Sequence, residues 1–238
     1  MDQHPDRPTA PVHHDPSRPH PLRVAFDSEL RGVRDGVLRM GSLVESQIGE
    51  ALASLVTHDA DRALRVIASD APINAAQREI ESLITLTIAT QQPVARDLRN
   101  LLVLEAIAAE LERMGDYAGS VAKQARKLAP NAPIAGYDRL ELMGALAASQ
   151  VRGVLRAVVE LDEIAAREIA ARDDELDALY HTLFGQVLEG MRANPDTVDA
   201  GARVLFAAHY LERVGDRVTN IAEQVVYLAT GETVDLND

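Results

Sequence analysis

The sequence predicts an all-α protein built as two tandem three-helix bundles, with six long helices related by an internal duplication. Three observations lead to this prediction. Apolar residues recur at steps of three and four along most of the chain, which is the period of a helix with one buried face. No segment shows the sustained alternation of apolar and polar residues that is typical of a half-buried strand. Parts of the second half repeat the first half in the same order.

The first half predicts three helices joined by short connections. The first begins near Phe26 and runs for about 30 residues to a polar turn over 57–61. The second covers 64–92 and stops at Pro93, because proline has no backbone N–H and its ring clashes with the preceding turn of a helix. The third covers 94–128, and two prolines follow it closely.

The second half predicts a similar set of helices. A fourth helix covers 138–161, and a fifth covers about 172–192 before an Asn-Pro pair ends it. The sixth runs to about Thr230 and is followed by Gly231, the residue type most common just after a helix. Because the connections are short, consecutive helices are expected to lie antiparallel.

These helices define the expected domains. The first bundle spans 22–130 and the second spans 134–231, followed by a C-terminal tail over 232–238. Residues 1–21 hold six of the eleven prolines and four of the seven histidines. Such a segment buries too little apolar surface to offset the entropy lost on ordering, so we expect a disordered tail.

Two motifs carry the repeat. The hexapeptide Leu-Glu-Arg-Met-Gly-Asp at 111–116 returns 100 residues later as Leu-Glu-Arg-Val-Gly-Asp at 211–216. The pattern Asp-x-x-Ile-Asn at 70–74 returns 103 residues later as Asp-x-x-Leu-Asp at 173–177. A repeat that keeps the order of both motifs indicates duplication of a three-helix unit.

Composition excludes several classes of function. The chain has 24 Lys+Arg against 37 Asp+Glu, a net charge of −13, which repels nucleic-acid backbones. Aromatic residues make up 3% and Trp is absent, so stacking platforms for bases are not expected. Without cysteine there is no disulfide and no thiolate metal site. We expect a cytoplasmic protein, because the sequence has neither a signal-peptide core nor an apolar run of about 20 residues.

The repeated acids are the candidate functional residues. Glu112 and Asp116 stand four apart on a helix, as do Glu212 and Asp216, so each pair of like charges is adjacent on one face. Helical geometry places the first pair away from the apolar seam, facing outward or toward another part of the protein. The glycine before each Asp suggests close approach of another helix or of a bound group.

Further oxygen donors are expected from the neighbouring helices. Asp70 and Asn74 stand on the second helix, Asp173 and Asp177 on the fifth, and Asn220 lies one turn beyond Asp216. Facing helices that each present acids four residues apart can surround a hard cation with oxygen ligands. The alternative is a solvated acidic face without any ligand. The predicted metal ligands are Asp70, Asn74, Glu112, Asp116, Asp173, Asp177, Glu212, Asp216 and Asn220.

No catalytic residues are predicted. A di-iron carboxylate enzyme would use Glu-x-x-His, and His58, His181 and His209 all lack a Glu three residues earlier. The sequence contains no nucleophile elbow, P-loop or dinucleotide fingerprint. We therefore expect a protein that is not an enzyme.

At the two copies of Leu-Glu-Arg-apolar-Gly-Asp the sequence resembles the PhoU family, the accessory proteins of phosphate transport. The second copy, extended over 211–223, matches the family signature most fully. The segment Val-Ala-Arg-Asp-Leu-Arg at 94–99 resembles the start of the family's third helix. The resemblance covers about residues 26–230 and both halves.

This resemblance implies a role that composition and periodicity do not. PhoU-like proteins are cytoplasmic, usually homodimeric negative regulators of phosphate uptake and of the phosphate-starvation response. They are thought to act between the ATPase subunit of a Pst-type ABC transporter and a phosphate-sensing histidine kinase, so they meet the membrane only through partner proteins. Family members can carry metal ions at the acidic motifs, which here implies iron, manganese, magnesium or zinc.

This chain departs from the pattern in its first half. Tyr117 and Ser120 stand where the second copy has Arg217 and Asn220, and Asn74 replaces a carboxylate, so metal is expected more at the second site than at the first. Two other functions stay open. One is a metal-free helical adaptor of a Pit-type phosphate permease, and the more remote one is a carboxylate-bridged metalloenzyme.

Overall fold

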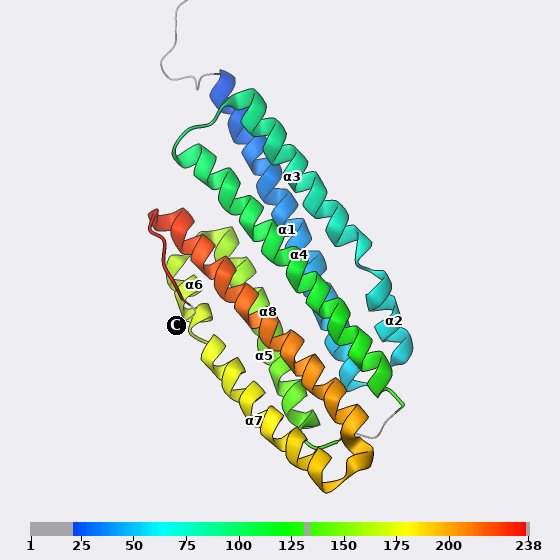
Figure 1. The fold of residues 1–238 in the computed structure, drawn as a ribbon. Helices are drawn as coiled ribbons and strands as arrows, with labels where there is room; N and C mark the ends of the chain where they lie inside the picture. Colours follow the sequence, from blue (N-terminus) through cyan, green and yellow to red (C-terminus); the bar gives the residue numbers. More distant parts are fainter. Residues whose placement is uncertain (1–20, 131–133, 237–238) are drawn as a thin grey trace, which may run out of the picture.

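The computed structural model describes residues 21–130 and 134–236, and all the described elements are helices (Figure 1). The tail expected over 1–21 falls, except for Pro21, outside the described residues. The described helices are α1 (Pro21–Val56), α2 (Ala60–Ala68), α3 (Ala71–Gln91), α4 (Arg96–Leu128), α5 (Tyr137–Glu160), α6 (Glu163–Ala170), α7 (Asp173–Ala193), the short 3-10 helix η1 (Pro195–Thr197) and α8 (Val198–Thr230).

The six long helices confirm the predicted all-α fold of two three-helix units. Helices α1, α3 and α4 form the first unit, and α5, α7 and α8 form the second (Figure 1). Two short helices were not anticipated. Helix α2 precedes α3 and α6 precedes α7, and each is capped by an aspartate side chain, Asp59 or Asp162, that accepts backbone N–H bonds.

The prediction of a single helix over 64–92 is wrong, because the helical structure is interrupted between α2 and α3. Pro72 lies in the first turn of α3, where its missing N–H costs nothing. Within a continuous helix its ring would clash with the carbonyl of Ala68, four residues earlier. Ser69 closes α2 instead, with its N–H bonded to Val66 O. The break gives α3 its own beginning at the acidic Asp70.

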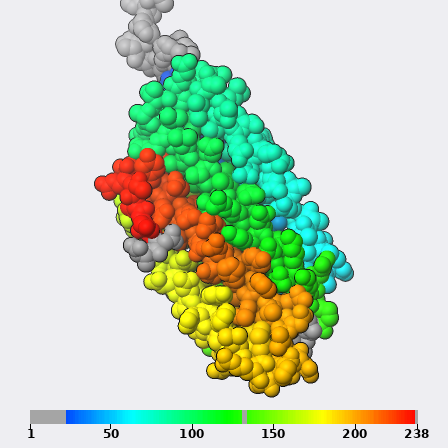
Figure 2. All heavy atoms as spheres, viewed as in Figure 1, coloured from blue at the N-terminus to red at the C-terminus, as the bar shows by residue number. Residues whose placement is uncertain are grey.

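The two units pack with α4 and α8 side by side and antiparallel through the middle of the molecule (Figure 1). Helix α3 flanks α4 and α7 flanks α8, so these four helices form most of the face seen in Figure 2. Helices α1 and α5 contact each other behind this face. The buried core consists mainly of Ala, Val, Leu, Ile and Met side chains, as expected for a chain with few rings.

Two glycines permit the contact of α1 with α5. A Cβ on Gly41 would lie 2.6 Å from Leu155 Cδ2, and a Cβ on Gly144 would lie 3.3 Å from Leu52 Cδ1. In the repeat with a shift of 103 residues, Gly41 corresponds to Gly144 and Leu52 corresponds to Leu155. Each contact therefore joins the glycine of one unit to the matching leucine of the other. The duplicated units therefore pack about an approximate twofold axis.

Helix α5 is the one helix in the described part of the chain that is long and apolar enough to cross a bilayer. Of its most apolar stretch, 44% is buried inside the fold. Core helices of soluble proteins pass the same length and composition test. Its buried side, which includes Leu140, Met143 and Val151, belongs to the core of the second unit.

Candidate functional site

The second acidic cluster forms between α7 and α8. Asp173 and Asp177 lie on the first turns of α7, and Glu212 and Asp216 lie in the middle of α8. Gly215 permits this approach, because a Cβ there would lie 2.6 Å from Leu176 Cδ2 and would also meet the Asp173 carboxylate. The close helix contact expected at this glycine is confirmed.

Burial and mutual repulsion raise the pKa values of Glu212, Asp173 and Asp177. Burial raises the pKa of Glu212 to about 7, and the neighbouring Asp216 and Asp177 add to the rise. Burial raises the pKa of Asp173 to about 6, with further increases from Asp177 and Asp216. The pKa of Asp177 is raised by burial and then by Asp216. Each carboxylate on one helix therefore experiences the charge of carboxylates on the other.

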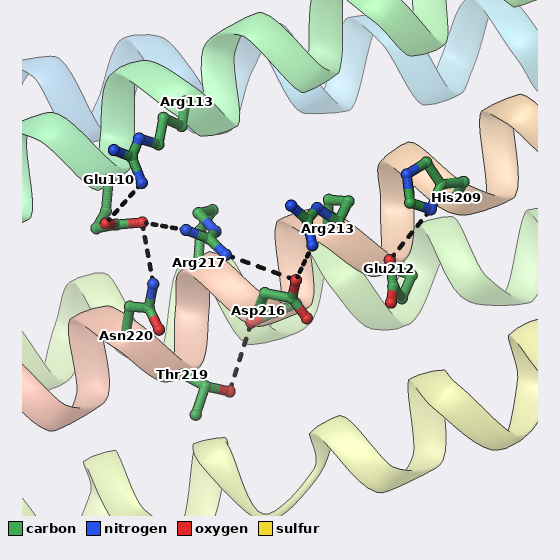
Figure 3. A network of polar contacts seen from close by, with 10 residues as sticks. Glu110, Arg113, His209, Glu212, Arg213, Asp216, Arg217, Thr219 and Asn220 are labelled. Atoms are coloured by element: carbon green, nitrogen blue, oxygen red, sulfur yellow. Dashed lines mark hydrogen bonds and ion pairs between the residues drawn. The ribbon is translucent and has the colours of Figure 1, made fainter. Parts of the chain in front are cut away.

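Arginines neutralise only part of this charge. Arg213 Nη1 donates to Asp216 Oδ2 at 3.2 Å, and Arg217 Nη2 lies 3.5 Å from the same oxygen (Figure 3). His209 Nδ1 lies 3.5 Å from Glu212 Oε2. The buried Oδ1 of Asp173 has no hydrogen-bond partner. An unpartnered carboxylate oxygen beside other acids is a donor available to a cation.

The first acidic cluster has the same plan but less repulsion. Burial raises the pKa of Glu112, and Asp116, Asp70 and Glu81 raise it further. Burial also raises the pKa of Asp116, with a contribution from Asp70. Asn74 Nδ2 donates to Asp70 Oδ2 at 2.8 Å, where the second cluster has the acid pair of α7. The amide thus satisfies an oxygen that a second carboxylate would repel.

Asn220 contacts the other unit of the fold. Its Nδ2 donates to Glu110 Oε2 of α4 at 3.3 Å, and Arg217 Nη1 donates to the same oxygen at 3.2 Å (Figure 3). Glu110 and Arg217 have side chains only 15% and 14% exposed, so this ion pair is largely withdrawn from water. The amide nitrogen of Asn220 is therefore used between α4 and α8.

The contact between Glu110 and Arg217 was not predicted from the sequence, although the repeat contained a signal for it. At the matching place in the other unit, Tyr117 stacks on Tyr210 with ring centroids 6.2 Å apart. The 100-residue shift exchanges Glu110 with Tyr210 and Arg217 with Tyr117. The paired differences between the copies are thus two alternative contacts of α4 with α8, one ionic and one aromatic.

The carboxylates of the second acidic cluster are of the chemical type that binds a hard cation, but in the described structure they are not already arranged as a metal site. Carboxylate oxygens suit Mg²⁺, Mn²⁺, Ca²⁺ or ferric iron. Among the described residues, no three His, Asp or Glu side chains already converge on one point as metal ligands. Side chains of the second cluster would have to rotate toward one another to hold an ion, which the unpartnered Asp173 oxygen permits.

Comparison with known proteins identifies the fold and its repeat. The PhoU domain model matches residues 37–125 and again 140–225. The PhoU homologue of Clostridium acetobutylicum, named a phosphate-specific transport system accessory protein, is 38% identical over 91% of this chain and 99% of its own. The homologue of Rhizobium meliloti is 36% identical over 88% of this chain and 89% of its own.

Solved structures agree with this comparison. PhoU from Pseudomonas aeruginosa superposes with a TM-score of 0.84 at 33% identity, over 87% of this chain and 100% of that one. The phosphate transport system regulatory protein PhoU from Streptococcus pneumoniae has a TM-score of 0.82 at 31% identity, over 88% and 99% of the two chains. On its duplicated helical units, its repeated acidic motif and these similarities, the chain belongs to the PhoU family.

Proposed function

We propose that this PhoU-type regulator of phosphate transport is a cytoplasmic, homodimeric adaptor that represses phosphate uptake and the phosphate-starvation response when phosphate is plentiful. Its partners would be the ATPase subunit of a Pst-type ABC transporter and a phosphate-sensing histidine kinase. The observation that carries the proposal is similarity across nearly the whole chain to relatives named for phosphate-specific transport. The resemblance noted in the sequence supplies the repressive role and the kinase.

A reporter of the phosphate-starvation response in the source organism tests this role. Deletion of the gene is expected to leave the reporter active in phosphate-rich medium, and the intact chain should restore repression. Co-purification with the transporter ATPase from the same cells tests the adaptor role. A deletion strain that still silences the reporter at high phosphate would contradict the proposal.

We propose that regulation involves a cation at the second acidic cluster. Asp173, Asp177, Glu212 and Asp216 would hold it, and the bound charge would offset the repulsion that, after burial, raises the pKa of Asp173 and of Glu212. The first cluster is the weaker candidate, because Asn74 already satisfies Asp70. Catalytic turnover is not part of this function, since no acid of either cluster belongs to a Glu-x-x-His motif.

Elemental analysis of the purified protein tests the cation. Wild-type protein incubated with iron, manganese, magnesium or zinc and then desalted should retain metal, and the Glu212→Ala/Asp216→Ala variant should lose most of it. The matched control is Glu112→Ala/Asp116→Ala, which should retain more. Circular dichroism of both variants should show nearly unchanged helicity, because these side chains lie off the apolar seam. Equal metal content in wild type and Glu212→Ala/Asp216→Ala would exclude the site.

A further inference from the structure

An apolar pocket of about 340 Å³ opens between α7 and α8, the pair of helices on one side of the face in Figure 2. Tyr180 and Phe184 line it from α7, and Phe206 and His209 line it from α8. Phe206 is 55% exposed and Phe184 is 40% exposed, although aromatic residues make up only 3% of the chain. Exposed rings gathered at a pocket are typical of binding surfaces.

The other half of the chain shows that the fold does not require these rings. In the sequence repeat, the residue that corresponds to Phe184 is Glu81, 103 residues earlier, and the residue that corresponds to Phe206 is Ala106, 100 residues earlier. Both shifts also match buried residues: the buried Ile80 corresponds to the buried Leu183 at a shift of 103, and the buried Leu111 corresponds to the buried Leu211 at a shift of 100. Helices α3 and α4 still contact each other with Glu and Ala at these places. A three-helix unit therefore forms without rings at these places, and the exposed parts of Phe184 and Phe206 are available to a partner.

The apolar pocket lies next to the second acidic cluster. His209, at its edge, lies 3.5 Å from Glu212, one turn further along α8 (Figure 3). On α7, Asp177 precedes Tyr180 by three residues and so lies on the same face. The pocket and the adjacent acids, together called the α7–α8 groove, thus present aromatic rings at one end and four carboxylates at the other. A partner complementary to it must carry bulky apolar side chains next to basic ones.

We propose that the α7–α8 groove is a docking site for a basic amphipathic helix of a partner protein, with apolar side chains in the aromatic pocket and Lys or Arg at the acids. Helices commonly bind in apolar grooves through anchors spaced by one turn. The inference extends the proposed adaptor role by naming its docking surface. Its test measures binding in solution and uses no phosphate phenotype, so the two can fail separately.

The probe is a fluorescent helical peptide of about 18 residues, roughly five turns, with Leu and Phe on one face and Lys on the other. The matched peptide carries Glu in place of Lys. Binding to the full-length chain is followed by fluorescence polarisation with a chelator present, so that bound cations do not compete. The test variant is Phe184→Glu/Phe206→Ala, which installs the residues of the first half and should fold. The control is Leu86→Glu, which changes an exposed leucine of α3.

The Lys peptide should bind wild type and the control equally, and the double variant should bind it about tenfold or more weakly, as expected for loss of two buried anchors. The Glu peptide should bind none of them. Unchanged binding by a folded double variant, or equal binding of both peptides, would overturn the proposal. Sedimentation velocity adds a second criterion. If the double variant dissociates a wild-type dimer, the groove is an interface between copies of this chain, and the proposal fails.

Discussion

Asp173 and Asn74 show how single residues distinguish two otherwise similar sites. Asp173 lies against Gly215 and has an unpartnered oxygen, and its pKa rises to about 6 because of burial and neighbouring acids. In the first half, Asn74 instead donates to Asp70. One amide in place of one carboxylate removes a charge and adds a hydrogen bond. The duplicated sites therefore differ in their electrostatic demand for a cation.

We expect Asn74→Asp to make the first cluster resemble the second. The variant loses the Asn74–Asp70 hydrogen bond and gains a like charge four residues away, which together should cost about 1–2 kcal/mol of unfolding free energy in chelator. Added Mn²⁺ should recover more stability in the variant than in wild type. Thermal unfolding with and without Mn²⁺ measures both effects. Equal stabilisation of the two proteins by Mn²⁺ would argue against a site there.

The raised pKa of Glu212 predicts how stability depends on pH. The folded chain keeps a proton on Glu212 up to about pH 7, whereas the ordinary value for the unfolded chain is 4.5. Between these values the folded state binds more protons, so this group makes the unfolding free energy fall as pH rises. Metal-free Glu212→Gln should lose less stability than wild type between pH 4.5 and pH 7. Urea unfolding at several pH values measures this. Glu105→Gln, at an exposed glutamate, serves as the control. If the unfolding free energy of Glu212→Gln changed with pH as steeply as that of wild type, the prediction would be contradicted.

At the scale of elements, helix periodicity was predictable and helix breaks were harder. The seams of α1, α4, α5 and α8 follow directly from apolar residues three and four apart. Pro72 was the available signal for the break between α2 and α3, and Asp162 was the signal for α6. Such short helices span too few residues for their apolar pattern to be separated from that of the next helix, so caps and prolines are the clearer marks.

The connection between α3 and α4 contains a strained residue. Ala95 has φ 47° and ψ −115°, a conformation that suits glycine and that residues with a Cβ rarely adopt. Ala95→Gly should therefore raise the unfolding free energy, by about 1 kcal/mol. Ala178→Gly, inside α7, should lower it by a similar amount, because glycine is unfavourable in a helix. Urea unfolding distinguishes the two, and destabilisation by Ala95→Gly would exclude strain at this residue.

At the scale of the whole molecule, the two units are held by contacts on both sides of the approximate twofold axis. Glycines let α1 and α5 meet behind, and the Glu110–Arg217 pair and the Tyr117–Tyr210 stack join α4 to α8. Because Arg217 also lies 3.5 Å from Asp216, the second acidic cluster is in contact with the junction of the units.

Gly144→Val tests this packing. The new side chain would meet Leu52 of α1, and overpacking of this kind costs about 1–3 kcal/mol. Gly49→Val is the matched control, since a Cβ at Gly49 would have no neighbour within 4 Å apart from its chain neighbours and the backbone of its own helix. Unfolding in urea should show a lower midpoint for Gly144→Val alone. Equal midpoints for the two variants would mean that α1 and α5 separate easily.

The sequence by itself determined the all-α class, the duplication and the family, because these depend on periodicity and on motifs that survive in linear order. The repeated acids were predictable as candidate ligands, since like charges four apart have no role in a core, and their binding of a metal stays a prediction. The tertiary structure alone decided which helices face each other across the axis. It assigned Asn220 a contact with Glu110 and showed that the differing residues of the copies are paired. The physical reason is that contacts between segments about 100 residues apart depend on packing, which local patterns do not encode.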